Sequence, residues 1–220
     1  MINELILLFH ILLISAAAGI SLLLEREALV AFVTVQIILA NLFVIKQTTI
    51  LGFNATTADA YAIGAMIGFN LMQEFYGRAL ARKTIATTFF FSLFYAIASH
   101  IHLAYTPNSC DTSHEFFKPI LCNAPHIVIA SIIVFAICQV IDLIVYGFLK
   151  RVWHRRFLIM RNYISIGISQ FADTALFSAC LWALGLITNL ADIIAISFTI
   201  KFIITLIATP LIIQIAKLRK

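Results

Sequence analysis

Long hydrophobic runs separated by short polar connections make up almost the whole chain. Each run is long enough to cross about 30 Å of hydrocarbon as a helix, which takes about 20 residues. The pattern therefore predicts seven membrane-spanning helices. The predicted segments are Leu5–Leu24, Ala28–Ile45, Asp59–Tyr76, Ile85–Tyr105, His126–Leu149, Tyr163–Leu186 and Leu190–Ile215.

Two connections are longer than the others. A turn-rich stretch, QTTILGFNATT, follows the second segment, and a loop from Thr106 to Pro125 follows the fourth. That loop holds Cys110 and Cys122, which can pair if the loop faces an oxidising compartment. The first segment ends in SLLLERE without a small-residue cleavage site, so we expect it to remain a helix.

Composition agrees with this pattern. Hydrophobic residues make up 62% of the chain, charged residues 11%, and the mean hydropathy is +1.03. Soluble domains carry about 25% charged residues. We therefore expect an all-α, polytopic transmembrane helix bundle forming a single domain over residues 1–220, with no attached soluble domain.

The distribution of basic residues predicts the orientation. Twelve of the fifteen Lys and Arg residues fall on one side of the seven-segment arrangement, two on the other, and Lys201 lies inside a segment. Cytoplasmic loops are enriched in Lys and Arg. The N-terminus is therefore expected outside and the C-terminus in the cytoplasm, and the net charge of +5 is no sign of nucleic-acid binding.

The fifth and sixth segments carry the same polar pattern. Gln139, Asp142 and Tyr146 share one helical face, and so do Gln170, Asp173 and Phe177, because residues three and four apart are neighbours on a helix. Counted from the basic connection, the two aspartates are expected at a similar depth. Each face offers an amide, a carboxylate and a ring.

Further polar groups lie in the other segments: Asn41 in the second, Asn70 and Glu74 in the third, and Lys201 in the seventh. One interpretation is that these groups only hold helices together, through hydrogen bonds or an ion pair such as Lys201 with Asp173. Three deep carboxylates against one lysine favour the other interpretation, a binding cavity.

Motifs of soluble enzymes are absent from the sequence. It has no G-x-S-x-G, H-E-x-x-H or Walker A motif and no C-x-x-C pair, so we expect no enzyme, no cofactor and no metal site. An intramembrane enzyme using Asp142 and Asp173 as a dyad remains a less favoured alternative.

Five sequence motifs resemble the queuosine precursor transporter family. They are ANLFVIK, NLMQEFYGRALARK, CQVIDLIVYGFLK, RNYISIGISQFADTALF and IKFIITLIATP, and they cover most of the chain after the first segment. Where that family usually has an aspartate four residues before the glutamate of the third segment, this chain has Asn70.

The resemblance implies an inner-membrane importer of a deazapurine precursor of queuosine for tRNA modification. Candidate substrates are 7-cyano-7-deazaguanine, 7-aminomethyl-7-deazaguanine and queuine. One aspartate would accept from the amine edge of the ring, a glutamine would donate to the carbonyl, and Phe177 or Tyr146 would stack on the face. The implied substrate-binding residues are Asn41, Asn70, Glu74, Gln139, Asp142, Tyr146, Gln170, Asp173, Phe177 and Lys201.

Several properties stay open from the sequence. The chain is either a transporter by itself, as a facilitator or a proton symporter, or the substrate-binding subunit of an energy-coupled vitamin importer. The partners expected are the small molecule and the lipid bilayer, with homo-oligomerisation open and no direct contact with nucleic acid.

Overall fold

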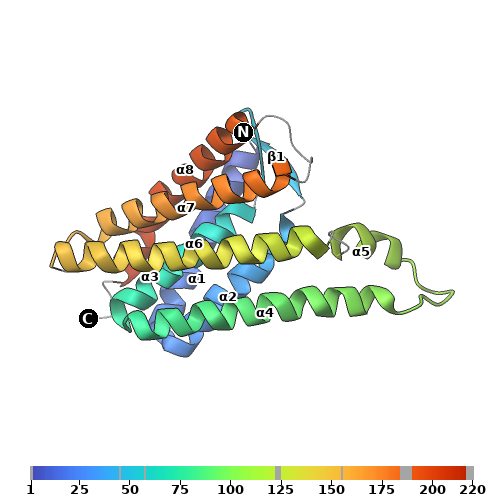
Figure 1. The fold of residues 1–220 in the computed structure, drawn as a ribbon, viewed down its shortest axis with the longest axis horizontal. Coiled ribbons are helices and arrows are strands. Elements are labelled where there is room, and N and C mark those ends of the chain that lie inside the picture. The colour runs from blue at the N-terminus through green and yellow to red at the C-terminus, as the bar shows by residue number, and fades with distance from the viewer. Residues whose placement is uncertain are drawn as a thin grey trace.

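The protein is a bundle of long helices with one small β-hairpin (Figure 1). The structure is a computed structural model that describes residues 2–44, 46–56, 58–121, 125–154, 156–183 and 190–216. Within these ranges the helices are α1 (Ile2–Leu24), α2 (Arg26–Phe43), α3 (Ala58–Phe75), α4 (Arg78–Ala104), α5 (His114–Leu121), α6 (Pro125–Val152), α7 (Leu158–Ala183) and α8 (Leu190–Ala216). The strands are β1 (Gln47–Ile50) and β2 (Phe53–Thr56).

Each of the seven predicted segments corresponds to one long helix, with shifted ends. The largest shift is at α4, which begins at Arg78 rather than Ile85, and α7 begins at Leu158 rather than Tyr163. Arg161 and Asn162, which the sequence places in the basic connection, are therefore helical, and both are fully buried. The prediction that Arg161 belongs to the basic connection between two segments was wrong.

The two long connections contain secondary structure that the sequence pattern did not predict. The turn-rich stretch is an antiparallel hairpin in which Gln47 pairs with Thr56 and Ile50 with Phe53. Its two turn residues, Leu51 and Gly52, have φ of 53° and 83°. Positive φ at both central residues is the geometry that matches the twist of paired strands.

The other long connection contains the short helix α5, which lies at one end of the bundle (Figure 1). Asp111 precedes it, and its Oδ1 accepts hydrogen bonds from the backbone N–H groups of Ser113 and His114. These bonds hold the pKa of the Asp111 carboxyl below its ordinary value. Cys122 lies outside the described residues, so the expected pairing with Cys110 stays a prediction.

Helix α3 is the centre of the bundle. It packs against each of the other long helices, α1, α2, α4, α6, α7 and α8. Every side chain from Ile63 to Gln73 is buried. A helix enclosed on all sides can carry polar residues at membrane depth, because other helices rather than lipid surround them.

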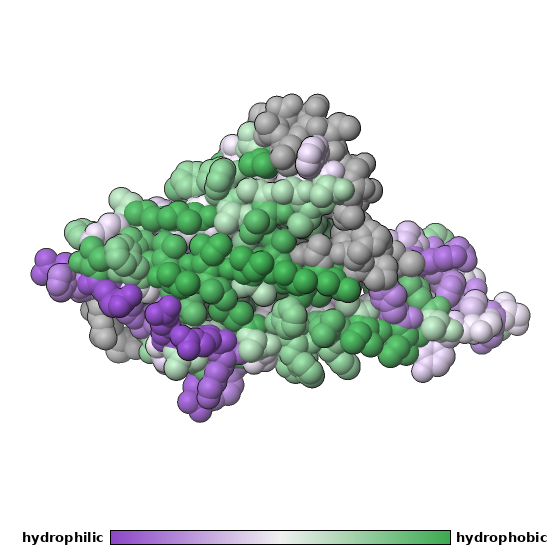
Figure 2. Space-filling view, in the orientation of Figure 1, coloured by the Kyte–Doolittle hydropathy of each residue, from purple (hydrophilic) through white to green (hydrophobic). Residues whose placement is uncertain are grey.

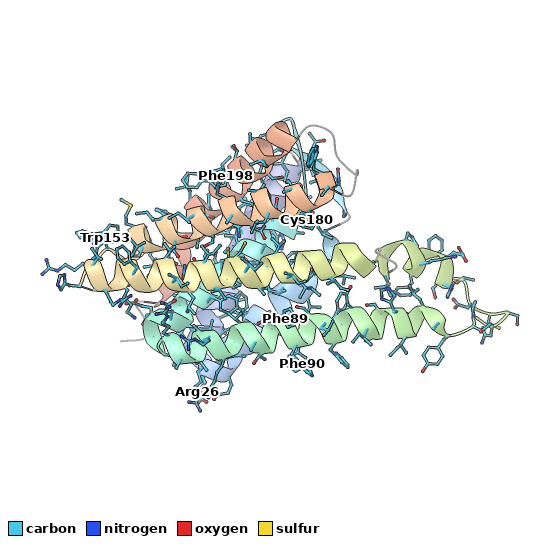
Figure 3. All side chains as sticks on the ribbon, viewed as in Figure 1. Arg26, Phe89, Phe90, Trp153, Cys180 and Phe198 are labelled. Atoms are coloured by element: carbon cyan, nitrogen blue, oxygen red, sulfur yellow. The ribbon has the colours of Figure 1, made fainter. Side chains whose placement is uncertain are left out.

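The outer faces are hydrophobic. A broad hydrophobic band crosses the face shown in Figure 2, with hydrophilic residues gathered at its two ends. Phe90 of α4 points away from the bundle and is 61% exposed (Figure 3). Among the described residues, helices α1, α2 and α4 and parts of α6 and α8 are long and apolar enough to cross a membrane. Helices α3 and α7 are less apolar, because they carry the polar residues of the interior. Over the described residues, the fold is thus an all-α membrane bundle with one hairpin.

Two glycines allow α3 to approach its neighbours closely. A Cβ added at Gly64 would lie 2.5 Å from Cγ2 of Ile14 on α1, and one added at Gly68 would lie 2.6 Å from Cγ2 of Val33 on α2. Small residues four apart are a common means of close packing between membrane helices.

We predict that Gly68→Ala lowers the free energy of unfolding by about 1–3 kcal/mol, the usual effect of overpacking. Val33→Ala in the same chain should recover part of the loss, because it removes Cγ2 of Val33, the methyl group that the new Cβ at position 68 would contact. Thermal unfolding of the protein purified in detergent measures both. Gly167→Ala is the matched control, since nothing lies within 4 Å of a Cβ there. Equal unfolding temperatures for Gly68→Ala and Gly167→Ala would contradict the packing argument.

Candidate functional site

One buried lysine joins three helices through two carboxylates. Lys201 of α8 donates a hydrogen bond from Nζ to Oδ2 of Asp173 on α7 at 2.8 Å. The same nitrogen donates to Oγ1 of Thr174 at 3.3 Å and lies 3.8 Å from Oδ1 of Asp59 on α3. Lys201 is only 8% exposed. The ion pair that the sequence raised, Lys201 with Asp173, is therefore present and has a second acidic neighbour.

Asp59 was missed at the sequence level. It was treated as the first residue of the third segment and not as part of the polar set. The signal that could have found it is helical spacing. Asp59, Asn70 and Glu74 fall on one face of α3, because separations of 11 and 15 residues are close to whole numbers of turns.

These charged groups border a cavity of about 220 Å³. Its walls come from α2, α3, α6, α7 and α8, and Thr56 of β2 also lines it. Phe135 and Phe177 supply aromatic wall, and Asn41 supplies an amide. The volume lies below the range of about 300–1,000 Å³ found for drug-sized ligands, so the cavity suits a ligand of one or two rings.

Four of the ten residues proposed from the sequence line this cavity: Asn41, Asp173, Phe177 and Lys201. The other six do not. Asn70, Gln139, Asp142 and Gln170 lie in a buried layer, and Glu74 and Tyr146 lie in a cluster beyond it.

The buried layer is centred on Asp142 of α6, which is 1% exposed. Its Oδ1 accepts hydrogen bonds from the hydroxyls of Ser165 and Ser169 on α7. Asn70 of α3 lies beside the same carboxylate. Ser165 is two helical turns before Asp173, and Ser169 is one turn before it. The two aspartates are therefore about 6–12 Å apart along α7, and the prediction of similar depth was wrong.

This offset also separates Asp142 and Asp173 chemically. An aspartyl dyad needs two carboxylates close enough to share one proton. Here Asp142 is bonded to two serines and Asp173 to Lys201. The arrangement therefore does not form a dyad.

A second charged cluster lies where α3 ends. Oε2 of Glu74 accepts from Nη1 of Arg161 at 2.8 Å and from the Tyr146 hydroxyl at 3.1 Å, and it lies 3.1 Å from Nζ of Lys150. Nζ of Lys150 also donates to the carbonyl oxygens of Gln73 and Glu74. The guanidinium of Arg161 lies 5.2 Å from the centre of the Tyr146 ring. Glu74 is therefore held in an ion-pair cluster.

The two clusters change the count of charges inside the bundle. Glu74 meets two cations, and Lys201 meets two carboxylates. Of these deep carboxylates, Asp142 alone has no cationic partner among the described residues. The excess of acid that favoured a cavity is smaller than the sequence indicated, because Lys150 and Arg161 reach inward.

Comparison with known proteins gives two matches. A family described as "Putative vitamin uptake transporter" matches residues 56–215. A Bacillus subtilis (strain 168) protein named "Probable queuosine precursor transporter" is 31% identical over 176 residues, which cover 78% of this chain and 76% of that protein. No solved structure matches. Both charged clusters and the buried layer lie within the matched family region.

Glu74→Gln should lower the free energy of unfolding by about 2–4 kcal/mol. The change leaves Arg161, which is 0% exposed, without its carboxylate, and breaking a buried pair from one side costs about 3–5 kcal/mol. The lower range allows for the partial exposure of Glu74 and for the hydrogen bonds that glutamine still accepts. Unfolding in detergent, followed by tryptophan fluorescence, measures the loss.

Glu27→Gln is the control for this prediction. Glu27 pairs with Arg26, but both side chains are more than 60% exposed, and such surface pairs contribute little. Its unfolding temperature should equal that of the unchanged protein. If the two variants unfold at the same temperature, Glu74 does not stabilise the bundle through Arg161.

Proposed function

The chain belongs to the queuosine precursor transporter family, and from this we propose that it imports a queuosine precursor across the inner membrane for tRNA modification. The candidate substrates are 7-cyano-7-deazaguanine, 7-aminomethyl-7-deazaguanine and queuine. The observation that carries the proposal is the cavity bordered by Asp59, Lys201 and Asp173, because it combines paired charges with aromatic wall. The name of the Bacillus subtilis relative supports the same substrate class.

A deazaguanine ring fits the chemistry of this cavity. Its ring N–H and exocyclic amine lie side by side, and one carboxylate can accept from both. We assign that role to Asp173, while Lys201 donates to the ring carbonyl. Phe177 stacks on the face of the ring, and Asn41 supplies a further hydrogen bond.

The charges favour precursors that carry an amine. Two carboxylates around one lysine leave one negative charge when all three groups are ionised. The aminomethyl group of 7-aminomethyl-7-deazaguanine and the secondary amine of queuine are cationic at neutral pH. A cationic substrate would balance the remaining charge of the pair Asp59 and Asp173.

We propose that the single domain spans the membrane seven times, with the N-terminus outside and the C-terminus in the cytoplasm. The basic residues support this orientation. Arg26 begins α2, Arg78 begins α4, and Lys150 lies near the end of α6. If successive long helices cross the membrane in alternating directions, these three residues lie on the same side, the cytoplasmic one. Figure 3 places Arg26 and Trp153 toward the same end. Asp59 lies at the opposite end of α3 from Glu74, so the cavity is nearer the outside. That is the side from which an importer takes up its substrate.

Asp173→Asn should reduce uptake at least tenfold, because an amide cannot accept from both donors of the ring edge. Folding should persist, since Asp59 still lies beside Lys201. The measurement is uptake of labelled 7-aminomethyl-7-deazaguanine, or queuosine in tRNA, in cells without their own importer. Asp111→Asn, in the exposed loop before α5, should transport normally.

Three results would count against the proposal. Normal uptake by Asp173→Asn refutes the assignment of the site. No uptake of any precursor by the unchanged protein refutes the transport function. If the chain co-purifies with an ATPase pair and gives no uptake without that pair, it is the substrate-binding subunit of an energy-coupled vitamin importer.

A further inference from the structure

A column of polar side chains continues from the cavity along the interface of α3, α6 and α7. Phe135 and Asp173 line the cavity on α6 and α7. One helical turn further along each helix are Gln139 and Gln170, because residues three and four apart lie one above the other. Asp142 and Asn70 follow at the next turn. The column is thus a direct continuation of the cavity.

Several amide atoms of this column lack hydrogen-bond partners among the described residues. Gln139 is 1% exposed, and neither its Oε1 nor its Nε2 meets a partner among the described residues. Oδ1 of Asn70, which is 0% exposed, and Oε1 of Gln170 also lack a partner among the described residues, while the Asn70 amide lies beside the Asp142 carboxylate. Nε2 of Gln170 faces only the sulfur of Met66, a weak acceptor.

Unpaired amides at this depth are not explained by helix packing. A polar side chain that holds helices together does so by bonding across the interface, and a buried polar atom without a partner destabilises the fold. Of the layer, only Asp142 is well bonded, by Ser165 and Ser169. The amides therefore destabilise this state of the bundle, which calls for a compensating role.

A second cavity, of about 500 Å³, lies beyond the column. Gln73, Lys150 and His154 line it, and Trp153 marks that end of α6 in Figure 3. The cluster of Glu74 and Arg161 separates this cavity from the amide layer. Asp59 at the first cavity and Glu74 at this cluster are about 22 Å apart along α3, at about 1.5 Å per residue. The amide layer lies between the two.

We propose that Asn70, Gln139 and Gln170, together with Asp142, form a second binding site for a planar heterocycle with adjacent hydrogen-bond donors and acceptors. Amide side chains can bond to both the donors and the acceptors of such a ring, because each amide offers one acceptor oxygen and two N–H donors. The carboxylate accepts from an amine edge. The site holds the ligand deeper than the first cavity, on its way to the second. This inference rests on the proposed function, since it takes the same substrate class.

Access to this second site requires a local change. Met66 contacts Gln170 and fills part of the layer in this structure. A methionine side chain has three rotatable bonds and adapts readily to a new neighbour. A rotation of the Met66 side chain away from Gln170 opens a path between the first cavity and this layer. Ala62, one turn earlier on the same face of α3, lines the wall of the first cavity.

Gln139→Leu and Gln170→Leu test the proposal. Leucine has a similar volume and removes unpaired polar atoms, so the purified full-length variants should unfold at or above the temperature of the unchanged protein. Uptake of labelled 7-aminomethyl-7-deazaguanine and 7-cyano-7-deazaguanine in cells should fall at least tenfold. A rise in stability with a loss of transport is the signature of a binding residue.

Gln36→Leu is the matched control. Gln36 of α2 is 6% exposed, its Oε1 also lacks a partner among the described residues, and it faces Gly64 rather than the cavity. Its uptake should equal that of the unchanged protein. The comparison separates the loss of any buried glutamine from the loss of one in the column.

Two outcomes overturn the second site. Normal uptake by both leucine variants shows that the amides do not contact the substrate. A lower unfolding temperature together with lost uptake shows that they support the fold. The proposed function fails in a different way, by an absence of uptake in the unchanged protein, and the unfolding temperatures of the leucine variants then still decide whether the amides are structural.

Discussion

Charge pairing inside the bundle fixes the position of α3. The helix carries Asp59 near its start and Glu74 near its end, and each meets cations from other helices. Lys201 reaches the first from α8, and Lys150 and Arg161 reach the second from α6 and α7. An ionised group without a partner is very costly in apolar surroundings. A shift of α3 by one turn would break both sets of pairs, so the two ends hold the helix in register.

The interior between these ends is held differently. Ion pairs stabilise the ends, whereas the amide of Gln139, between them, has no partner among the described residues. Packing supports the rest of α3, since Gly68 allows α2 to approach closely. Strong pairing at two levels and weak pairing between them suit a protein that exchanges a polar ligand through its middle while the bundle stays assembled.

Some of the site followed from local pattern, and some did not. The intramembrane positions of Asp173 and Lys201 suggested their ion pair. Charged side chains inside a membrane are few, so each has few possible partners. Asp59 was left out of the polar set and Arg161 was assigned to a connection because each lies at the end of a hydrophobic run, where a charge is normally at the membrane surface. The hairpin was missed because ILGF carries no strong turn signal of the Asn-Gly kind.

The sequence by itself determined the class of the protein: apolar runs of spanning length specify membrane helices, and helical periodicity specifies which residues share a face. Only the tertiary structure decided which faces meet and at what height. Asp142 lies level with Ser165 and Ser169, not with Asp173, because the offset between α6 and α7 is set by packing along their whole length. Periodicity within one helix carries no information about that offset. It therefore predicted the members of the polar set but not their partners.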